Sequence, residues 1–427
     1  MMTTRMKHLL LIVDAFPPDF APRMGYLCRC LETMPEASKE WQVTVIAPDE
    51  GGRLYDIPYE RTEIHRIPLH PTSGPFRSLR WSLGFLGTLL FDLKGRRFRR
   101  CVEQICAGRD FDLLLCSTYY TFPLNTALSF SRSHQIPFIA DLRDIAEEYT
   151  ENDFFQHPLP HLMGLERLIA HLYRSVSIRR RNKVLRQADI VTSVSPWHTQ
   201  TVVPFLSSPE RAFVIYNGFD GEQFVPKKMN TEKFIITYTG RLYNRSIRDP
   251  RLLFPALRTL MDTLPTFAQD AEVHWYTDDR SWEEAEELSR KHHTEALSRR
   301  CPSVPISQMP AVLNRSSVVL VVSNRTPDNG PKGILTTKFF EALGCERPVL
   351  CLRSDEDLLE DAIRATGIGC AARTQQDAED FLRKKYLQWK SEGRTTQSIV
   401  PEQRDFYSRQ SQACQFLDLF HTLTDRK

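Results

Sequence analysis

The chain has 427 residues, of which 41% are hydrophobic, 26% are charged and 10% are aromatic. This length predicts two or three domains that each bury a core, and the composition excludes wholesale disorder and fibrous repeats. The 56 Lys and Arg residues nearly balance the 53 Asp and Glu residues, so the net charge gives no reason to expect a nucleic-acid partner.

The ten cysteines do not have the spacing of a disulfide framework or a zinc site. Most of them lie singly in apolar runs, as Cys116 and Cys351 do, and a reducing, cytoplasmic setting is the simplest interpretation. The first apolar run, residues 9–13, is too short for a signal peptide. The apolar stretch 81–93 is too short to span a bilayer.

Short apolar runs separated by amphipathic stretches predict alternating strands and helices in the first half of the chain. The predicted strands are 9–16, 42–48, 111–118, 137–142, 190–195 and 213–218. The clearest predicted helices are 26–34, 98–105 and 125–134. Near-continuous apolar strands that alternate with helices are typical of a parallel sheet covered on both faces.

The same alternation begins again after residue 228. The predicted strands are 234–240, 271–277, 317–323 and 347–352, and the predicted helices are 250–264, 282–297, 337–343 and 374–389. The predicted fold class is therefore α/β, with two doubly wound Rossmann-like domains. We expect the domains to span residues 1–228 and 229–405, and a helix over 406–427 to pack back toward the first domain.

Ligands of open parallel sheets bind beyond the carboxyl ends of the strands, so the loops that follow the strands are the candidate sites. The loop after the first strand leads to Arg23, Met24 and Gly25 at the start of a helix. Unpaired N–H groups at a helix N-terminus suit an anion or a sugar hydroxyl. The alternative is an ordinary turn with Arg23 in solvent, since the loop contains no GxGxxG sequence and the chain no Walker sequence.

The loop after strand 234–240 contains a glycine followed by four arginines. These residues are Gly240, Arg241, Arg245, Arg248 and Arg251. Glycine lets the backbone approach a ligand closely, and guanidinium groups bind phosphate oxygens in bidentate fashion. Arginines on a solvated surface turn are the alternative.

A Gly/Pro-rich loop within residues 323–350 leads into a helix that carries Lys338 and Glu341 one turn apart. The candidate amide donors and helix caps of this loop are Gly333, Ile334, Leu335, Thr336 and Thr337. Such a loop could present amides to a diphosphate, and Glu341 could accept both hydroxyls of a ribose. The alternative is a plain surface salt bridge between Lys338 and Glu341. A diphosphate with a sugar attached fits this loop and the arginine loop together.

Several segments resemble glycosyltransferases of the GT-B fold, specifically the large retaining group known as family 4. In the N-terminal half these segments are FPPDFAPRMGYL, IPFIADLRDI and VIYNGFDGEQF, and in the C-terminal half they are YTGRLYNRSIRDP and KGILTTKFFEALGCERPVL. The last segment is the most specific, because it combines a Lys-x-x-Glu helix with an Arg-Pro-Val strand. The resemblance covers nearly the whole chain and implies two Rossmann-like domains that face a central cleft.

The resemblance implies transfer of a sugar, with retention, from a UDP- or GDP-linked donor to a saccharide or lipid-linked saccharide. The donor would bind the C-terminal domain and the acceptor the N-terminal domain. Arg241 and a second arginine, Arg248 or else Arg245, would neutralise the leaving diphosphate, and Glu341 would hold the ribose. The amides of residues 334–336 would bind the β-phosphate. No cofactor and no metal are expected, because fixed cations stabilise the leaving group.

The sequence departs from the family pattern in two places. Family 4 commonly carries an E-x7-E pair, but the position eight before Glu341 is Gly333, and many relatives have His in place of Arg143. A non-catalytic relative that binds a nucleotide sugar or a partner, and a nucleotide-sugar 2-epimerase, are therefore alternatives. The residues that we expect at the acceptor side are Arg23, Met24, Gly25, Ser117, Arg143 and Asp144.

Residues 77–100 combine an apolar stretch with a cluster of cations. The cations are Lys94, Arg96, Arg97, Arg99 and Arg100. This pattern predicts contact with an anionic membrane surface, and a packed helix with solvated arginines is the alternative. For proteins similar to this one the expected role is bacterial polysaccharide, lipopolysaccharide or capsule synthesis. The expected location is the cytoplasm or the inner face of the cytoplasmic membrane, with no nucleic-acid partner.

Overall fold

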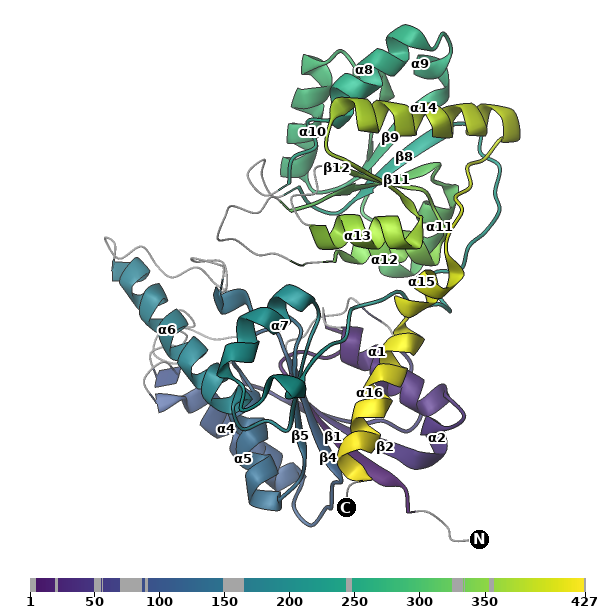
Figure 1. The fold of residues 1–427 in the computed structure, drawn as a ribbon. Coiled ribbons are helices and arrows are strands. Elements are labelled where there is room, and N and C mark those ends of the chain that lie inside the picture. Colours follow the sequence, from purple (N-terminus) through teal and green to yellow (C-terminus); the bar gives the residue numbers. More distant parts are fainter. Residues whose placement is uncertain are drawn as a thin grey trace. The chain divides into compact units, whose positions relative to one another are not determined.

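The structure is a computed structural model. It describes residues 5–19, 22–49, 55, 57–69, 87–88, 91–148, 165–242, 248–324, 333, 335–352 and 357–425. The chain divides into two compact units, as the ribbon in Figure 1 shows. The first unit consists of residues up to 216 together with those from 413, and the second of residues 217–412.

The first unit contains a seven-stranded parallel sheet with the strand order β3-β2-β1-β4-β5-β6-β7. Its strands are β1 (Lys7–Val13), β2 (Trp41–Pro48), β3 (Glu63–Ile67), β4 (Leu113–Thr118), β5 (Phe138–Leu142), β6 (Ile190–Ser193) and β7 (Ala212–Val214). Its helices are α1 (Pro22–Thr33), α2 (Ala37–Glu40), α4 (Leu93–Ile105), α5 (Leu124–His134), α6 (Leu165–Leu185) and α7 (Pro196–Val202), with the short helices η1 (Ala146–Glu148), η2 (Val203–Phe205) and η3 (Pro209–Arg211).

Strand β1 lies inside this sheet, between β2 and β4, and its apolar run is buried on both faces. Leu9, Leu11 and Val13 belong to one core cluster, whereas Leu10 and Ile12 belong to another. Successive side chains of a strand point to opposite faces, so one continuous apolar run supplies both cores.

The second unit contains a six-stranded parallel sheet with the order β10-β9-β8-β11-β12-β13. Its strands are β8 (Phe234–Thr239), β9 (Ala271–Tyr276), β10 (Ser298–Cys301), β11 (Val318–Val322), β12 (Val349–Leu352) and β13 (Gly369–Ala372). Its helices are α8 (Leu253–Thr263), α9 (Phe267–Asp270), α10 (Asp279–Lys291), α11 (Met309–Arg315), α12 (Thr337–Gly344), α13 (Asp357–Thr366), α14 (Gln375–Glu392) and α15 (Pro401–Phe406), with the short helices η4 (Glu295–Leu297) and η5 (Ile306–Gln308).

The predicted fold class is confirmed, because both sheets are parallel and both have the strand order of a doubly wound fold. Each predicted strand overlaps an observed one. Strands β3, β10 and β13, which lie at three sheet edges, were not predicted from the sequence. Two of these edge strands, EIHRI and SRRC, carry charged residues, and the third, GCAA, consists of small residues.

The segment that enters the second unit begins at residue 217, whereas the end of the first domain was predicted at residue 228. This segment contacts the second unit directly. The backbone N–H of Phe219 donates to the carbonyl of Tyr407 at 3.0 Å, and a Cβ on Gly218 would collide with that same carbonyl oxygen.

The last helix, α16 (Arg409–Thr424), starts in the residue range of the second unit and from Ala413 packs on the first. Phe416 and Phe420 are fully buried there, and the ring of Phe420 lies 5.2 Å from that of Trp41. Among the described residues, no helix has both the length and the apolar character needed to cross a membrane.

Candidate functional site

Helix α12 of the second unit carries Lys338 and Glu341 one turn apart, and both side chains are partly buried. Burial lowers the pKa of Lys338 to about 8; the nearby Arg248 adds to this effect and Glu341 opposes it. Burial raises the pKa of Glu341 to about 7, while Lys338 and Arg409 oppose the rise. Among the described residues no hydrogen bond or salt bridge joins Lys338 to Glu341, so they do not form the plain surface pair.

Gly240 lies against Lys338 at the carboxyl end of β8. Its φ of +99° lies outside the range that L side chains favour, and a Cβ there would be 2.7 Å from the Nζ of Lys338. The backbone of Gly240 is held on both sides, because its N–H donates to the Tyr276 carbonyl at 2.9 Å and its carbonyl accepts from the Thr277 hydroxyl at 2.6 Å. The two loops singled out in the sequence therefore meet at this point.

The arginines of the first of these loops have different environments. Arg248 donates from Nε to Asn324 Oδ1 at 2.9 Å and from Nη1 to the carbonyl of Arg241 at 2.7 Å. The side chain of Arg241 is 67% exposed, and its Nε lies 3.2 Å from Asp278 Oδ2. Arg251 instead pairs with the buried Asp249 at 2.5 Å. Arg245 lies outside the described residues.

The loop before α12 is described at Gly333 and from Leu335 onward, and Ile334 lies outside the described residues. Gly333 has a φ of +72°, a conformation that favours glycine. Thr336 occupies the N-cap position of α12, but its side chain makes no capping hydrogen bond, so the expected side-chain cap is wrong. The N–H of Phe339 donates to the Thr336 carbonyl at 3.1 Å, whereas the N–H groups of Thr337 and Lys338 have no partner among the described residues.

Arg409, at the start of α16, is a member of this cluster that was not predicted from the sequence. Its guanidinium is close enough to hold down the pKa of Glu341, and its Nη1 donates to Gln412 Oε1 at 3.0 Å. Arg409 lies far along the chain from Glu341 and belongs to no recognisable motif. Only the fold brings the two together.

In the first unit, Arg23 and Ser117 form part of a buried network around Asp141. Arg23 donates to the Asp141 carboxylate from Nε at 3.2 Å and from Nη2 at 3.1 Å, and Ser117 donates to it at 2.6 Å. Thr192 donates to the same carboxylate at 2.7 Å. Arg23 is only 2% exposed, so the alternative that placed it in solvent is wrong.

Met24 and Gly25 are also buried in the first turns of α1. A Cβ on Gly25 would lie 2.5 Å from the Tyr59 hydroxyl and 2.6 Å from Pro17 Cγ. The β1–α1 loop therefore packs closely over this glycine.

Arg143 follows β5 and forms an ion pair with Asp14, which follows β1. Its guanidinium lies over the ring of Tyr119, 4.0 Å from the ring centroid. The side chain of Arg143 is 1% exposed, yet its Nε and Nη1 have no hydrogen-bond partner among the described residues.

Asp144 faces the buried imidazole of His198, which lies in the first turn of α7. The His198 Nε2 lies 3.7 Å from Asp144 Oδ1, and its Nδ1 lies 2.8 Å from the Ser195 hydroxyl. Ser195 accepts from the His198 N–H as the N-cap of α7, so its own hydrogen is free to be donated to Nδ1. Burial lowers the pKa of His198 to about 4, so the ring is neutral at pH 7. Its buried Nε2 has no hydrogen-bond partner among the described residues.

Helix α4 of the first unit presents a cationic surface. Its exposed arginines are Arg96, Arg97, Arg99 and Arg100. Phe91 and Leu93 beside them are 58% and 49% exposed, whereas Lys94 lies over the Phe122 ring at 4.3 Å. Most of the apolar stretch 81–93 lies outside the described residues.

Comparison with known proteins finds one family model that matches part of the chain. Residues 22–218 match the model of the glycosyl transferase 4-like domain. No curated protein sequence matches the chain.

Solved structures resemble the chain over almost its whole length. Sucrose-phosphate synthase from Thermosynechococcus elongatus has a TM-score of 0.61 at 14% identity, covering 99% of this chain and 100% of that one. HepE from Anabaena in complex with UDP has a TM-score of 0.58 at 14% identity, covering 98% and 100%. A glycosyltransferase from Rickettsia africae has a TM-score of 0.63 at 10% identity, covering 99% and 100%. At these identities the likeness shows the fold.

Proposed function

We propose that this protein is a glycosyltransferase that uses a nucleotide-sugar donor. Its GT-B fold and the match of residues 22–218 to a glycosyl transferase 4-like domain support the proposal. The observation that carries the proposal is the cluster of Gly240, Arg248, Lys338 and Glu341 beyond the carboxyl end of β8. Ligands of doubly wound folds bind at this edge of the sheet.

The cluster has the chemistry that a nucleoside diphosphate requires. Arg248 and Lys338 would stabilise the negative charge that develops on the leaving diphosphate, and the exposed Arg241 would approach it from solvent. The first N–H groups of α12 would bind phosphate oxygens. Glu341 would accept hydrogen bonds from the ribose hydroxyls. These would replace the hydrogen bonds to water that the carboxylate loses on burial. We expect no metal to take part, because these fixed cations supply the positive charge.

The reaction that we propose breaks the bond between the anomeric carbon and the phosphate oxygen. The acceptor oxygen forms the new bond to that carbon, and its proton passes to the leaving phosphate. We propose that the anomeric configuration is retained, as the resemblance to family 4 implies. UDP is the first nucleotide to test, because HepE binds UDP and UDP-glucose in its solved complexes.

For the acceptor we propose a saccharide or a lipid-linked saccharide held by the first unit. Arg143 and Asp144 are the candidate contacts, since Arg143 keeps two buried nitrogens without a described partner and Asp144 remains partly exposed. The polar groups of Arg23 and Ser117 instead hold Asp141 within the fold. A role in bacterial cell-surface polysaccharide synthesis at an anionic membrane surface is supported by the cationic face of α4.

The test is calorimetric binding of UDP, GDP, ADP and CMP to the whole protein. We expect one nucleotide to bind and its affinity to fall at least tenfold in Arg248→Ala and Glu341→Ala. Arg258→Ala is the matched control, because Arg258 is a partly exposed residue of α8 that pairs with Asp262 on the same helix. Equal nucleotide affinity in all variants would mean that the donor site lies elsewhere. If the native protein bound none of the four nucleotides, a non-catalytic protein would be favoured. Isomerisation of a nucleotide sugar without acceptor would instead favour a 2-epimerase.

A further inference from the structure

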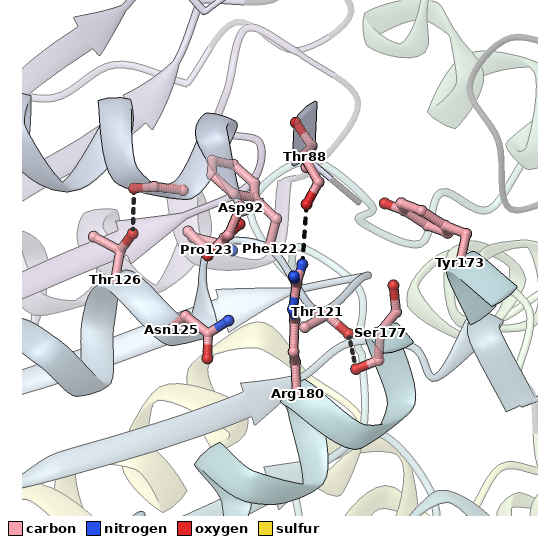
Figure 2. A pocket seen from close by; sticks show the side chains of 11 residues that line it. Thr88, Asp92, Thr121, Phe122, Pro123, Asn125, Thr126, Tyr173, Ser177 and Arg180 are labelled. Carbon is pink, nitrogen blue, oxygen red and sulfur yellow. Dashed lines mark hydrogen bonds between the residues drawn. The ribbon is translucent and has the colours of Figure 1, made fainter. Parts of the chain in front are cut away.

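The first unit contains a cavity between α4, α5 and α6, shown in Figure 2, that is too small for a sugar or a nucleotide. Its volume of about 30 Å³ has room for a few water molecules. Arg180 and Thr88 line it and are joined by a hydrogen bond of 3.1 Å from the guanidinium to the carbonyl. Buried charged groups that lie beside a candidate ligand site are found instead in the second unit, around α12.

The end of α15 and the start of α16 pack along α12. The ring of Tyr407, which follows α15, lies 5.7 Å from that of Phe339 and 5.8 Å from that of Phe340. Arg404 of α15 donates from Nη2 to the carbonyl of Gly344, the last residue of α12, at 3.2 Å. These contacts bring the start of α16 beside the helix that carries the candidate ribose acceptor.

Arg409, the first residue of α16, is buried at this point and held by both its backbone and its side chain. Its backbone N–H donates to the carbonyl of Phe219 at 2.8 Å. Its Nη1 donates to Oε1 of the buried Gln412 at 3.0 Å. The position of the guanidinium is therefore set by the second unit itself, to which all three residues belong.

The charged groups around Glu341 come from α12 and from the start of α16. Burial raises the pKa of Glu341 to about 7, and two cations oppose the rise, Lys338 on the same helix and Arg409 on α16. Cys345 also lies near Glu341, but burial raises the pKa of its thiol to about 12, so the thiol is uncharged at neutral pH. Burial, together with Arg248, lowers the pKa of Lys338 to about 8. A guanidinium stays charged at all these pH values, so Arg409 acts on Glu341 even where Lys338 loses its proton.

A ribose presents two neighbouring hydroxyls, and a carboxylate can accept a hydrogen bond from each of them. Such hydrogen bonds are roughly twice as strong when the acceptor is ionised. We propose that Arg409 is a positioning residue of the donor site: its guanidinium holds Glu341 as the carboxylate that accepts from both ribose hydroxyls, so that the site prefers a ribonucleotide to its 2′-deoxy form. The proposal rests on the proposed use of a nucleotide-sugar donor and adds the residue that sets this preference.

The experiment measures, by calorimetry on the whole protein, the affinities of UDP, GDP, ADP and CMP and of their 2′-deoxy forms between pH 5 and pH 9. The quantity compared is the ratio of the two affinities for each nucleotide. The two forms share their phosphates, so the titration of Lys338 cancels in this ratio. In the native protein we expect the preference for the ribonucleotide to rise as the pH passes about 7, where Glu341 loses its proton.

Arg409→Met removes the guanidinium, so Glu341 should lose its proton at a higher pH. We expect the rise in the ribonucleotide preference to move upward by about one pH unit or more, the size of shift that a neighbouring opposite charge causes. Arg409→Lys keeps a positive charge and should restore the native pH dependence. Arg409→Gln is a second neutral variant if Arg409→Met does not fold, which thermal unfolding followed by circular dichroism verifies.

Arg404→Met is the matched control, because Arg404 also packs on α12 but pairs with Glu346 at 3.2 Å. A loss of packing alone should weaken both forms of the nucleotide equally and leave the pH of the rise unchanged, and this is the result that we expect for Arg404→Met.

Three outcomes overturn the role of Arg409 while nucleotide binding, and with it the proposed function, stands. They are an unchanged pH dependence in the neutral variants of Arg409, equal affinity of the native protein for the two forms at every pH, and the same shift in Arg404→Met. If the native protein binds none of the nucleotides, the proposed donor site fails and the role of Arg409 fails with it.

Discussion

The backbone of Gly240 and the ammonium group of Lys338 occupy positions that leave no room for a side chain at residue 240. A Cβ there would lie 2.7 Å from Nζ and 2.8 Å from Cε of Lys338. Because Gly240 has no Cβ, the side chain of Lys338 on α12 can lie directly against the end of β8. Burial and Arg248 lower the pKa of Lys338 to about 8, so its ammonium group is still mostly protonated at pH 7 and could attract an incoming phosphate.

Gly240→Ala is expected to lower both stability and nucleotide affinity. The positive φ alone should cost about 1 kcal/mol of unfolding free energy. Displacement of Lys338 should weaken binding of the nucleotide at least tenfold. Gly108→Ala is the control, because Gly108 has a φ of +73° but a Cβ added there would meet no atom within 4 Å. Urea unfolding and calorimetry should show a similar loss of stability in both variants but a loss of affinity only in Gly240→Ala; equal affinities would contradict the contact with Lys338.

Glu341→Gln is expected to stabilise the protein at pH 8 but not at pH 5. The native pKa of about 7 lies above the unfolded value of roughly 4.3, so the native state holds the extra proton between these values. Stability therefore falls as pH rises through this window, and glutamine removes that fall. We expect about 1 kcal/mol at pH 8, less than the full shift would give, because the side chain is only partly buried.

Urea unfolding of Glu341→Gln at several pH values measures this effect, with Glu402→Gln, exposed on α15, as the control. A stability difference that does not change between pH 5 and pH 8 would mean that Glu341 is ionised in both states over this range.

Arg23→Met is expected to destabilise the first unit by about 3–5 kcal/mol, because it leaves the buried Asp141 carboxylate without its cation. Adding Asp141→Asn should recover part of the loss, since the buried charge is then gone. Urea unfolding of both variants measures the coupling. If Arg23 only contacted the acceptor, Arg23→Met would instead raise KM and leave stability unchanged. That result would support a place for Arg23 in the acceptor site.

Replacement of the four exposed arginines of α4 by serine is expected to abolish binding to liposomes that contain phosphatidylglycerol. The four positions are Arg96, Arg97, Arg99 and Arg100. Each cation near an anionic surface contributes about 1 kcal/mol, so the native protein should bind measurably and release at high salt. The control is the double replacement of Arg299 and Arg300 on β10 of the second unit. Co-sedimentation measures binding, and a native protein that stays in the supernatant would contradict the prediction.

The apolar runs of the sequence were sufficient to predict the central strands. Because β1 is buried on both faces, its sequence is an almost uninterrupted apolar run, which is easily recognised as a strand. The edge strands were missed for the opposite reason. β3 and β10 each have one neighbouring strand and carry arginines or acids, so their composition resembles that of a loop.

The cluster in the second unit could be singled out from the sequence because several of its residues lie in local motifs. Lys338 and Glu341 lie on one helical turn, and Gly240 indicates a sharp change of backbone direction. Arg23 and Asp141 are 118 positions apart, and no local pattern signals that they form a buried pair. The same applies to Arg409 beside Glu341, since the contact exists only once the chain has folded.

Helix α16 closes the core of the first unit with residues that are made after the whole second unit. Phe416 and Phe420 cover the apolar surface of β1, β2 and α1, so that surface stays open while residues 217–412 are translated. At roughly 5–20 residues per second, this delay is about 10–40 s. The first unit therefore emerges from the ribosome incomplete, and its native state becomes accessible only when the last helix has left the exit tunnel.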